Sequence, residues 1–272
     1  MPSPLTPNAT LSSLHELNVI QFDRTHPAGQ PRRDTVIQEH PLRLEVDNAT
    51  YTLLRTPGAD RELAVGFLFT EGLIARVDDI LVLGECPDSP DVIRVKTSTP
   101  DDKPPRALMI TSSCGLCGRE DMDALVAALG RVEGRFPVSL ETLYRLPDAV
   151  RALQPLFSET GGAHASALFD LSGRIACVRE DVGRHNALDK LIGQALLHGQ
   201  SLHEMGLFLS GRTSLELITK VARARIPFVA AVGAPTSAAV EAANHLGITL
   251  CGFLREQRIS IYTHHARLPA ST

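Results

Sequence analysis

Hydrophobic and polar residues alternate with period two near the beginning of the chain and change to a helical spacing further along. The alternation predicts short strands, and the turn signal Asp47-Asn48 separates two of them. The strands are expected at residues 36–37, 42–46, 51–54, 80–83, 92–96 and 107–110. Apolar residues recur at helical intervals over residues 60–74, where Asp60 is the expected N-cap. These elements predict a small α+β domain at residues 34–110.

Beyond residue 110 the pattern predicts a larger domain at residues 111–272. A hairpin is expected where two alternating stretches flank the turn Ser172-Gly173. Further on, helical and strand-like stretches alternate with short connections, which favours parallel strands in a layered sheet. The expected helices are 121–129, 140–153, 186–198, 215–224 and 238–246, and the expected strands are 165–169, 175–179, 207–209, 228–232 and 249–254. The predicted fold class is therefore α/β, preceded by the small α+β domain.

The first 33 residues are rich in Pro, Ser and Thr and are expected to form a flexible tail. Within this tail, residues 11–22 are a candidate for pairing with another segment. The tail lacks a charged region followed by an apolar core, so it is not a signal peptide. No apolar run approaches the roughly 20 residues of a membrane span. We therefore expect a cytoplasmic protein that does not bind a membrane.

The composition disfavours nucleic acid as a partner. The 272-residue chain has 27 Lys and Arg against 31 Asp and Glu, so it carries no overall positive charge. Tryptophan is absent and aromatic residues make up 4%, which disfavours a platform for stacking bases. Any anion-binding site must therefore come from a local arrangement of residues.

The stretch Ser-Ser-Cys-Gly-Leu-Cys-Gly at residues 112–118 places Cys114 and Cys117 in one loop with two residues between them. Thiols at this spacing can lower one another's pKa, bind a metal, form a disulfide or carry sulfur as a persulfide. The surrounding glycines suit a loop that bends and moves. The remaining cysteines lie in apolar stretches and are expected to be core residues: Cys86, Cys177 and Cys251. The pair therefore predicts chemistry near the junction of the two domains.

Three alternatives for the cysteine pair fit the sequence less well. Structural zinc needs about four ligands, usually from two such pairs, and the other cysteines are scattered. A zinc deaminase would need a Glu where Ser166 follows His164, and its cysteines would come after the histidine. A thioredoxin-like site would start a long helix, whereas glycines and serines surround this pair. The acidic residues Glu120, Asp121 and Asp123 oppose thiolate formation, so the thiolate needs stabilisation from elsewhere.

Two similar loops follow neighbouring strands of the predicted parallel sheet. Residues 209–214 and 232–237 each leave an apolar strand, open a helix and end in Thr-Ser. We expect Thr213 and Glu216 to form a capping box at the first of these helices. Helix N-termini present free N–H groups and the positive end of the helix dipole, which favour phosphate. Both loops are expected at the carboxyl edge of the sheet, where ligands of open α/β sheets bind.

Cationic residues occur close to these loops in the sequence. Arg212 lies within the first loop, and Arg255 and Arg258 follow the last strand. Their guanidinium groups are donors suited to phosphate oxygens. A further polar stretch leads into a helix with apolar residues on one face, and it indicates that Arg184 or His185 lines a site. Together these residues predict a site for a nucleotide-like anion.

Six stretches of the chain occur in a fixed order between about residues 34 and 265. They are Ser113–Gly118, Thr160–His164, Glu180–Ala187, Ser210–Ser214, Val232–Ser237, and Gly252-Phe253 with Ile261-Tyr262-Thr263. Each one alone carries little information, but the ordered set is specific. It resembles the formate dehydrogenase accessory sulfurtransferase family, FdhD/NarQ.

The resemblance implies a protein that accepts persulfide sulfur from a cysteine desulfurase and transfers it to the molybdenum cofactor before that cofactor enters formate dehydrogenase. The cofactor, a bis-molybdopterin guanine dinucleotide, would be a bound substrate, and no permanent metal is expected. Cys114 would carry the persulfide, and Cys117 would be its helper or a second carrier. The resemblance also implies a homodimer and a C-terminal domain similar in fold to cytidine deaminases, which accounts for the His164 pattern without zinc.

The residues expected to bind the cofactor come from two segments. The resemblance assigns the segment Phe253, Leu254, Arg255, Glu256, Gln257 and Arg258. The loop argument adds Gly211, Arg212, Thr213 and Ser214. Two functions stay open: a sulfurtransferase, and a non-catalytic chaperone that binds and protects the cofactor with its cysteines on the metal. A zinc-dependent deaminase would be a third only if the purified protein held stoichiometric zinc.

Overall fold

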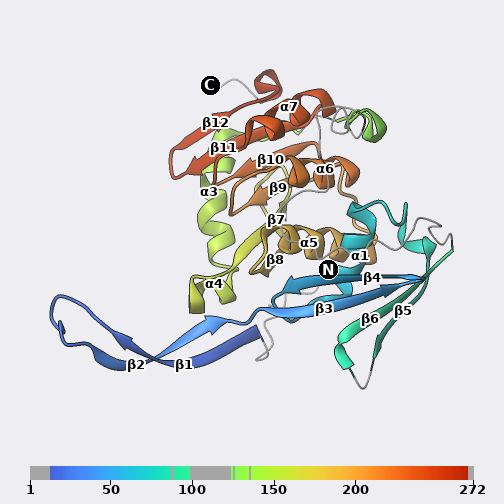
Figure 1. Ribbon diagram of the computed structural model, residues 1–272. Helices are drawn as coiled ribbons and strands as arrows, with labels where there is room; N and C mark the ends of the chain where they lie inside the picture. Colours follow the sequence, from blue (N-terminus) through green and yellow to red (C-terminus); the bar gives the residue numbers. More distant parts are fainter. Residues whose placement is uncertain (1–12, 87–88, 99–123, 125, 135, 269–272) are drawn as a thin grey trace.

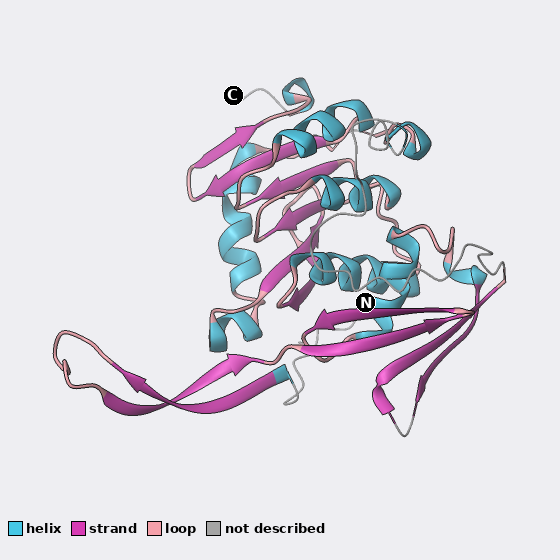
Figure 2. Ribbon diagram, viewed as in Figure 1, coloured by secondary structure: helices cyan, strands magenta, loops and turns pink. Residues whose placement is uncertain are grey.

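The structure is a computed structural model that describes residues 13–86, 89–98, 124, 126–134 and 136–268. In this part of the chain, two sheets and a two-stranded ribbon surround three clusters of buried apolar residues. The larger sheet belongs to the C-terminal part and the smaller one to the N-terminal part (Figure 1; Figure 2). The α/β fold class predicted from the sequence is confirmed.

The larger sheet has six strands in the order β12-β11-β10-β9-β7-β8. The strands are β7 His164–Phe169, β8 Ile175–Asp181, β9 Gly206–Leu209, β10 Phe228–Ala231, β11 Thr249–Arg255 and β12 Arg258–Ile261. The central strands β9, β10 and β11 are parallel, whereas β7, β8 and β12 add antiparallel pairs on either side. The predicted hairpin and the predicted parallel strands are confirmed.

Helices cover both faces of this sheet, as Figure 1 shows. One face is covered by α5 Arg184–Leu197, α6 Leu215–Arg223 and α7 Ser237–Leu246, and the other by α3 Leu140–Arg151, which short α4 Pro155–Thr160 follows. In β9, Leu207 and Leu209 belong to the first apolar cluster and Phe208 to the second. Burial on both faces explains why the parallel strands read as continuous apolar runs.

The smaller sheet has the strand order β4-β3-β6-β5 and one helix packed on it. Its elements are β3 His40–Val46, β4 Ala49–Arg55, α1 Asp60–Thr70, the 3-10 turn η2 Val77–Asp79, β5 Ile80–Cys86 and β6 Ser89–Thr97. The expectation that Asp60 caps α1 is wrong. Ala59 is the N-cap, with a φ of 54°, and the Asp60 carboxylate instead accepts a hydrogen bond from Arg55 Nε at 2.9 Å. The buried Arg55 guanidinium competes successfully for this carboxylate because it needs a partner.

The described part of the tail expected to be flexible, residues 13–33, instead forms most of a two-stranded ribbon. β1 Leu14–Gln21 pairs antiparallel with β2 Gln30–Ile37, and the ribbon projects from the rest of the molecule (Figure 1). Most residues of this ribbon are exposed on both faces, so their sequence shows no regular alternation of apolar and polar positions. The expected pairing of residues 11–22 with another segment is confirmed for residues 14–21, which pair with β2.

Helices α1 and α5 connect the two parts of the chain through a crossing of their backbones. A Cβ added to Gly66 would lie 1.8 Å from the Asp189 carbonyl oxygen, and a Cβ added to Gly193 would lie 1.8 Å from the Glu62 carbonyl oxygen. Glycine at both positions therefore permits this contact. The expected strand 107–110 and the expected domain boundary lie outside the described residues, so both stay predictions.

Candidate functional site

The two similar loops lie side by side at the carboxyl ends of β9 and β10, as the sequence predicts. The Gly233 N–H donates to the Gly211 carbonyl at 3.1 Å, and the Thr213 N–H donates to the Ala234 carbonyl at 3.1 Å. The Phe253 N–H donates to the Gly233 carbonyl at 3.2 Å. The first loop, the second loop and the end of β11 therefore form one layer at the edge of the sheet.

Glycines make this close approach possible. A Cβ on Gly233 would lie 2.6 Å from the Gly211 carbonyl oxygen, so any side chain there would push the loops apart. A Cβ on Gly211 would lie 3.2 Å from the imidazole ring of His164. The start of β7, which carries His164, is thus packed directly against the first loop.

The helices that follow the two loops begin differently. Thr236 is the N-cap of α7, and its hydroxyl accepts a hydrogen bond from the Ala239 N–H at 3.2 Å. Ser214, the N-cap of α6, makes no such side-chain bond. The Thr213 hydroxyl is fully buried and has no hydrogen-bond partner among the described residues. The capping box expected from Thr213 and Glu216 is therefore wrong, because the Glu216 carboxylate pairs with a histidine of α5.

Basic side chains from three elements lie beside the first loop. Arg184 and His185 begin α5, Arg212 lies in the loop, and His164 begins β7. The His185 Nε2 atom lies 3.0 Å from a Glu216 carboxylate oxygen. The Arg184 Nε atom is buried and, within the described part of the chain, has no hydrogen-bond partner. Both residues thus lie close to the first loop, and the expectation that Arg184 or His185 lines a site stays a prediction.

The electrostatic environment keeps His164 neutral. Burial lowers the pKa of His164, and the charge of Arg184 lowers this pKa further, whereas Asp181 raises it. His185 and Arg212 also lower it. Because the unperturbed pKa of histidine is already near 6.5, this lowering of the pKa favours the neutral imidazole at neutral pH.

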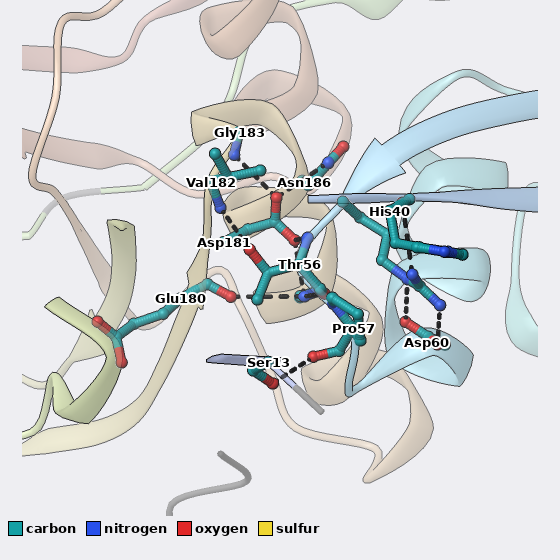
Figure 3. Close-up of polar contacts among 12 residues, drawn as sticks. Ser13, His40, Thr56, Pro57, Asp60, Glu180, Asp181, Val182, Gly183 and Asn186 are labelled. Carbon is teal, nitrogen blue, oxygen red and sulfur yellow. Dashed lines mark hydrogen bonds and ion pairs between the residues drawn. The ribbon is translucent and has the colours of Figure 1, made fainter. Parts of the chain in front are cut away.

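Other polar residues around the start of α5 contact the N-terminal part of the chain (Figure 3). Asp181 is fully buried, and its carboxylate accepts hydrogen bonds from the N–H groups of Thr56 at 3.1 Å and Gly183 at 2.8 Å. The ammonium group of Lys190 lies 2.7 Å from the same carboxylate. The Asn186 amide donates to Asp181 at 3.1 Å. This set is satisfied within the protein and holds the two parts of the chain together.

The segment 253–258, which was expected to bind the cofactor, spans the end of β11, the turn at residues 256–257 and the start of β12. Phe253 and Glu256 adopt positive φ angles of 53° and 35°. Non-glycine residues held in this region are strained, and such strain is typical of functional sites. The Leu254 side chain is fully buried in the apolar core, so it offers a ligand no surface. The remaining residues, Arg255, Glu256, Gln257 and Arg258, are exposed.

The cysteines divide into two groups. Cys114 and Cys117 lie outside the described residues, so their roles stay predictions. Burial raises the pKa of the Cys177 thiol to about 11 and that of Cys251 to about 12. Both are buried, as expected for core residues, and Cys86 is partly exposed. Among the described residues, no cluster of His, Cys, Asp and Glu could hold a metal ion.

Sequence reasoning missed the part that His164 plays in this geometry. In the sequence, His164 belongs to the stretch Thr160–His164 and is similar to a zinc-ligand pattern, but neither feature shows that β7 lies beside β9. The antiparallel pairing of β7 with β9, from Ser166 opposite Leu209 onwards, brings it there. The one available signal was Gly211, because a glycine in such a loop indicates close approach of another group.

The fold and this edge define an α/β protein in which two glycine-containing loops and the helix N-termini that follow them lie together at the carboxyl ends of the central strands. A family model described as "FdhD/NarQ family" matches residues 37–269. The chain therefore belongs to the FdhD/NarQ family, and the resemblance noted in the sequence is confirmed.

Relatives agree with this assignment, and a solved structure agrees with the fold. The chain is 41% identical to "Sulfur carrier protein FdhD" of Streptomyces avermitilis over 253 residues, covering 87% of this chain and 90% of that protein. It is 39% identical to the protein of the same name from Sulfurisphaera tokodaii over 240 residues, covering 86% and 92% of the two chains. A Desulfotalea psychrophila protein described as a "putative formate dehydrogenase accessory protein" has a similar fold, with a TM-score of 0.76, 22% identity and coverage of 94% of this chain and 99% of that one. No described helix is long and apolar enough to cross a membrane.

Proposed function

We propose that this chain is a sulfur carrier that serves formate dehydrogenase. It accepts sulfur from a cysteine desulfurase as a persulfide on Cys114 and transfers it to the molybdenum cofactor, a bis-molybdopterin guanine dinucleotide bound as substrate. The observation that carries the proposal is the Cys114–Cys117 pair in a chain that is 41% identical to a sulfur carrier protein. Cys117 serves as helper or as a second carrier.

The first step is exchange of a sulfur atom between two thiols. The Cys114 thiolate attacks the terminal sulfur of the donor persulfide, a new S–S bond forms on Cys114, and the donor cysteine leaves as a thiolate. Only a thiolate is nucleophilic enough for this attack. Cys177 and Cys251 are unsuited to it, since burial raises their pKa values to about 11 and about 12. Their burial supports the assignment to the Cys114–Cys117 loop.

The second step requires the cofactor to be bound nearby. Its guanine dinucleotide tails carry phosphates, and phosphate binds to helix N-termini and to guanidinium groups. The N-terminus of α6 lacks a side-chain cap, and Arg212 is exposed in the loop before it. These features support cofactor binding by Gly211, Arg212, Thr213 and Ser214. The exposed turn that contains Arg255 and Arg258 provides further donors.

The setting that we propose follows from these partners. The protein acts in the cytoplasm as a homodimer and docks in turn with the desulfurase and with formate dehydrogenase. Transfer of sulfur makes it a sulfurtransferase, and the persulfide on Cys114 is the covalent intermediate.

The test is the mass of the purified protein after incubation with a cysteine desulfurase and cysteine. We expect the mass to increase by one sulfur atom, and we expect Cys114→Ser to abolish this gain. Cys86→Ser is the matched control, because Cys86 is a partly exposed thiol outside the pair, and this variant should gain sulfur normally. A wild-type protein that gains no sulfur but restores formate dehydrogenase activity in cells would favour the chaperone function instead.

A further inference from the structure

Strands at the edge of a sheet expose backbone N–H and C=O groups that can pair with another chain, and proteins protect such edges with charges, prolines, bulges or short length. Among the described strands, β12 is four residues long and begins with Arg258, and β8 ends with the charged residues 179–181. The register of β5 shifts near both ends of its pairing with β6. Near the end of β4, the Leu54 carbonyl accepts a hydrogen bond from the Asn186 amide. Each of these edges is therefore protected or partly covered.

The outer edge of β1 lacks these features. β1 is eight residues long, pairs with β2 without a register shift and contains no Lys, Arg or Pro. The other strand of the ribbon is protected, because β2 contains Pro31, Arg32 and Arg33. Within the described part of the chain, β1 pairs with no strand other than β2. The two strands of one ribbon thus differ, and only β2 has the composition of an edge that stays unpaired.

The ribbon also needs further strands for its own stability. A two-stranded antiparallel ribbon is at best marginally stable in water, whereas three or more strands with an apolar face are stable. Figure 1 shows β1 and β2 projecting away from both sheets. Leu17 and Ile20 of β1 are 41% and 57% exposed, so the ribbon leaves apolar surface in contact with water. A strand added at the outer edge of β1 would supply hydrogen bonds and cover part of this surface.

We propose that the outer edge of β1 pairs with β1 of a second copy of this chain, antiparallel and about a two-fold axis at Leu17, so that the two ribbons form one four-stranded sheet. A two-fold axis lets the same surface serve both copies and closes the assembly at two. This pairing gives an interface to the homodimer of the proposed function, and it rests on that proposal for the number of copies.

The sequence of β1 favours this register over its neighbours. With Leu17 opposite Leu17 of the second copy, Leu14 lies opposite Ile20 and Glu16 lies opposite Asn18. Apolar side chains then face apolar ones, and the carboxylate faces an amide that can donate to it. An axis at Glu16 would place two carboxylates opposite each other, which is destabilising. An axis at Asn18 would place the Glu16 carboxylate opposite the apolar side chain of Ile20.

The first test is the mass of the full-length protein in solution, measured by sedimentation equilibrium over a range of concentrations. We expect a dimer. Leu17→Lys places two ammonium groups opposite each other at the axis, so the dissociation constant of the dimer should rise by about tenfold or more. Leu81→Lys is the matched control, because Leu81 is 65% exposed on the edge strand β5, whose register shifts disfavour pairing. This variant should keep the wild-type dissociation constant, and circular dichroism checks that both variants are folded.

The second test is a disulfide across the axis, which does not depend on a destabilising change. Opposite Cα atoms of an antiparallel pair lie about 4.5–5.5 Å apart, within the range of about 4.4–6.8 Å that a disulfide spans. Under mild oxidation, Leu17→Cys should therefore give a peptide linked to its own copy, identified by mass spectrometry. Asp34→Cys is the matched control, because Asp34 lies opposite Leu17 on β2. It would be three strand spacings, about 14 Å, from its copy and should give no such peptide.

Three results would overturn the inference. An unchanged dissociation constant in Leu17→Lys would reject β1 as the interface. Absence of the self-linked peptide in Leu17→Cys would reject the register, and an assembly larger than a dimer would reject the two-fold pairing.

Failure of the proposed function can be distinguished from failure of this interface, because the gain of sulfur from a desulfurase is measured separately. A dimer joined through β1 that gains no sulfur rejects the sulfur carrier function and keeps the interface. A monomeric wild-type protein that gains sulfur normally rejects the interface and the homodimer, and it keeps the sulfur carrier function.

Discussion

Buried polar residues on two sides of α5 differ in whether they have a partner within the protein. Where α5 meets the N-terminal part of the chain, buried charges are paired: Lys190 lies 2.7 Å from Asp181, and Lys220 lies 2.8 Å from Asp189. At the edge of the larger sheet, Arg184 presents a buried Nε that has no acceptor among the described residues. The paired side stabilises the junction, whereas the unpaired donor on the other side would be available to the ligand that we propose.

This difference has a thermodynamic consequence. Removing one member of a buried ion pair leaves the other charge without a partner and destabilises the fold. Removing a donor that has no partner costs little and can even stabilise the protein, because functional sites commonly reduce stability. Substitutions on the two sides of α5 should therefore change the free energy of unfolding by different amounts, and in some cases with opposite signs.

The largest effect is expected for Asp181→Ala. This change leaves Lys190 buried without its carboxylate and removes the acceptor of the Thr56 N–H, so the free energy of unfolding should fall by about 3–5 kcal/mol. Urea unfolding, monitored by circular dichroism, measures this free energy. Glu141→Ala is the control, because the ion pair of Glu141 with Arg145 is about as short, at 2.8 Å, but exposed, and should cost less than about 1 kcal/mol. Equal losses in the two variants would show that the junction is not held by its buried charges.

A smaller loss is expected for Gly193→Ala at the crossing of α1 and α5. The new Cβ would lie 1.8 Å from the Glu62 carbonyl oxygen, so the helices must separate, at a cost of about 1–3 kcal/mol. Alanine is intrinsically about 0.5–1 kcal/mol better than glycine inside a helix, so any loss reports the clash. In Gly84→Ala, where no atom lies within 4 Å of the added Cβ, the same measurement should show little change. A stable Gly193→Ala protein would mean that the junction can shift.

Elements with a strong local pattern could be predicted from the sequence. The parallel strands β9, β10 and β11 are apolar along their length because both faces are buried, and the helices between them show clear spacing. The adjacency of the loops at residues 209–214 and 232–237 followed, since neighbouring parallel strands end at the same edge. The fold class and the placement of Gly211 and Arg212 could therefore be predicted from the sequence.

Features that depend on contacts between distant residues could not be predicted in this way. His164 meets Gly211 only because β7 pairs with β9, and Asp60 loses its expected role as N-cap because buried Arg55 takes its carboxylate. For the ribbon of β1 and β2, the sequence indicated only that residues 11–22 could pair with another segment, because a strand exposed on both faces has no apolar periodicity. The stretch around Arg184 looked uniformly polar, and only the fold separates its paired residues from its unpaired ones.

The smallest effects concern the two similar loops, and they should have opposite signs. Thr213→Val replaces a buried hydroxyl that has no partner by a methyl group, so the free energy of unfolding should rise by about 1 kcal/mol. Thr236→Ala removes the hydroxyl that accepts a hydrogen bond from the Ala239 N–H, so the free energy of unfolding should fall by about 1 kcal/mol. Urea unfolding of both variants side by side, with sulfate binding measured on the same samples, tests the comparison. If Thr213 belongs with Arg184 to the side of α5 where donors lack acceptors, the Thr213→Val protein should be more stable and should bind sulfate, a stand-in for phosphate, more weakly. A loss of stability in Thr213→Val would place this hydroxyl on the paired side and contradict the division.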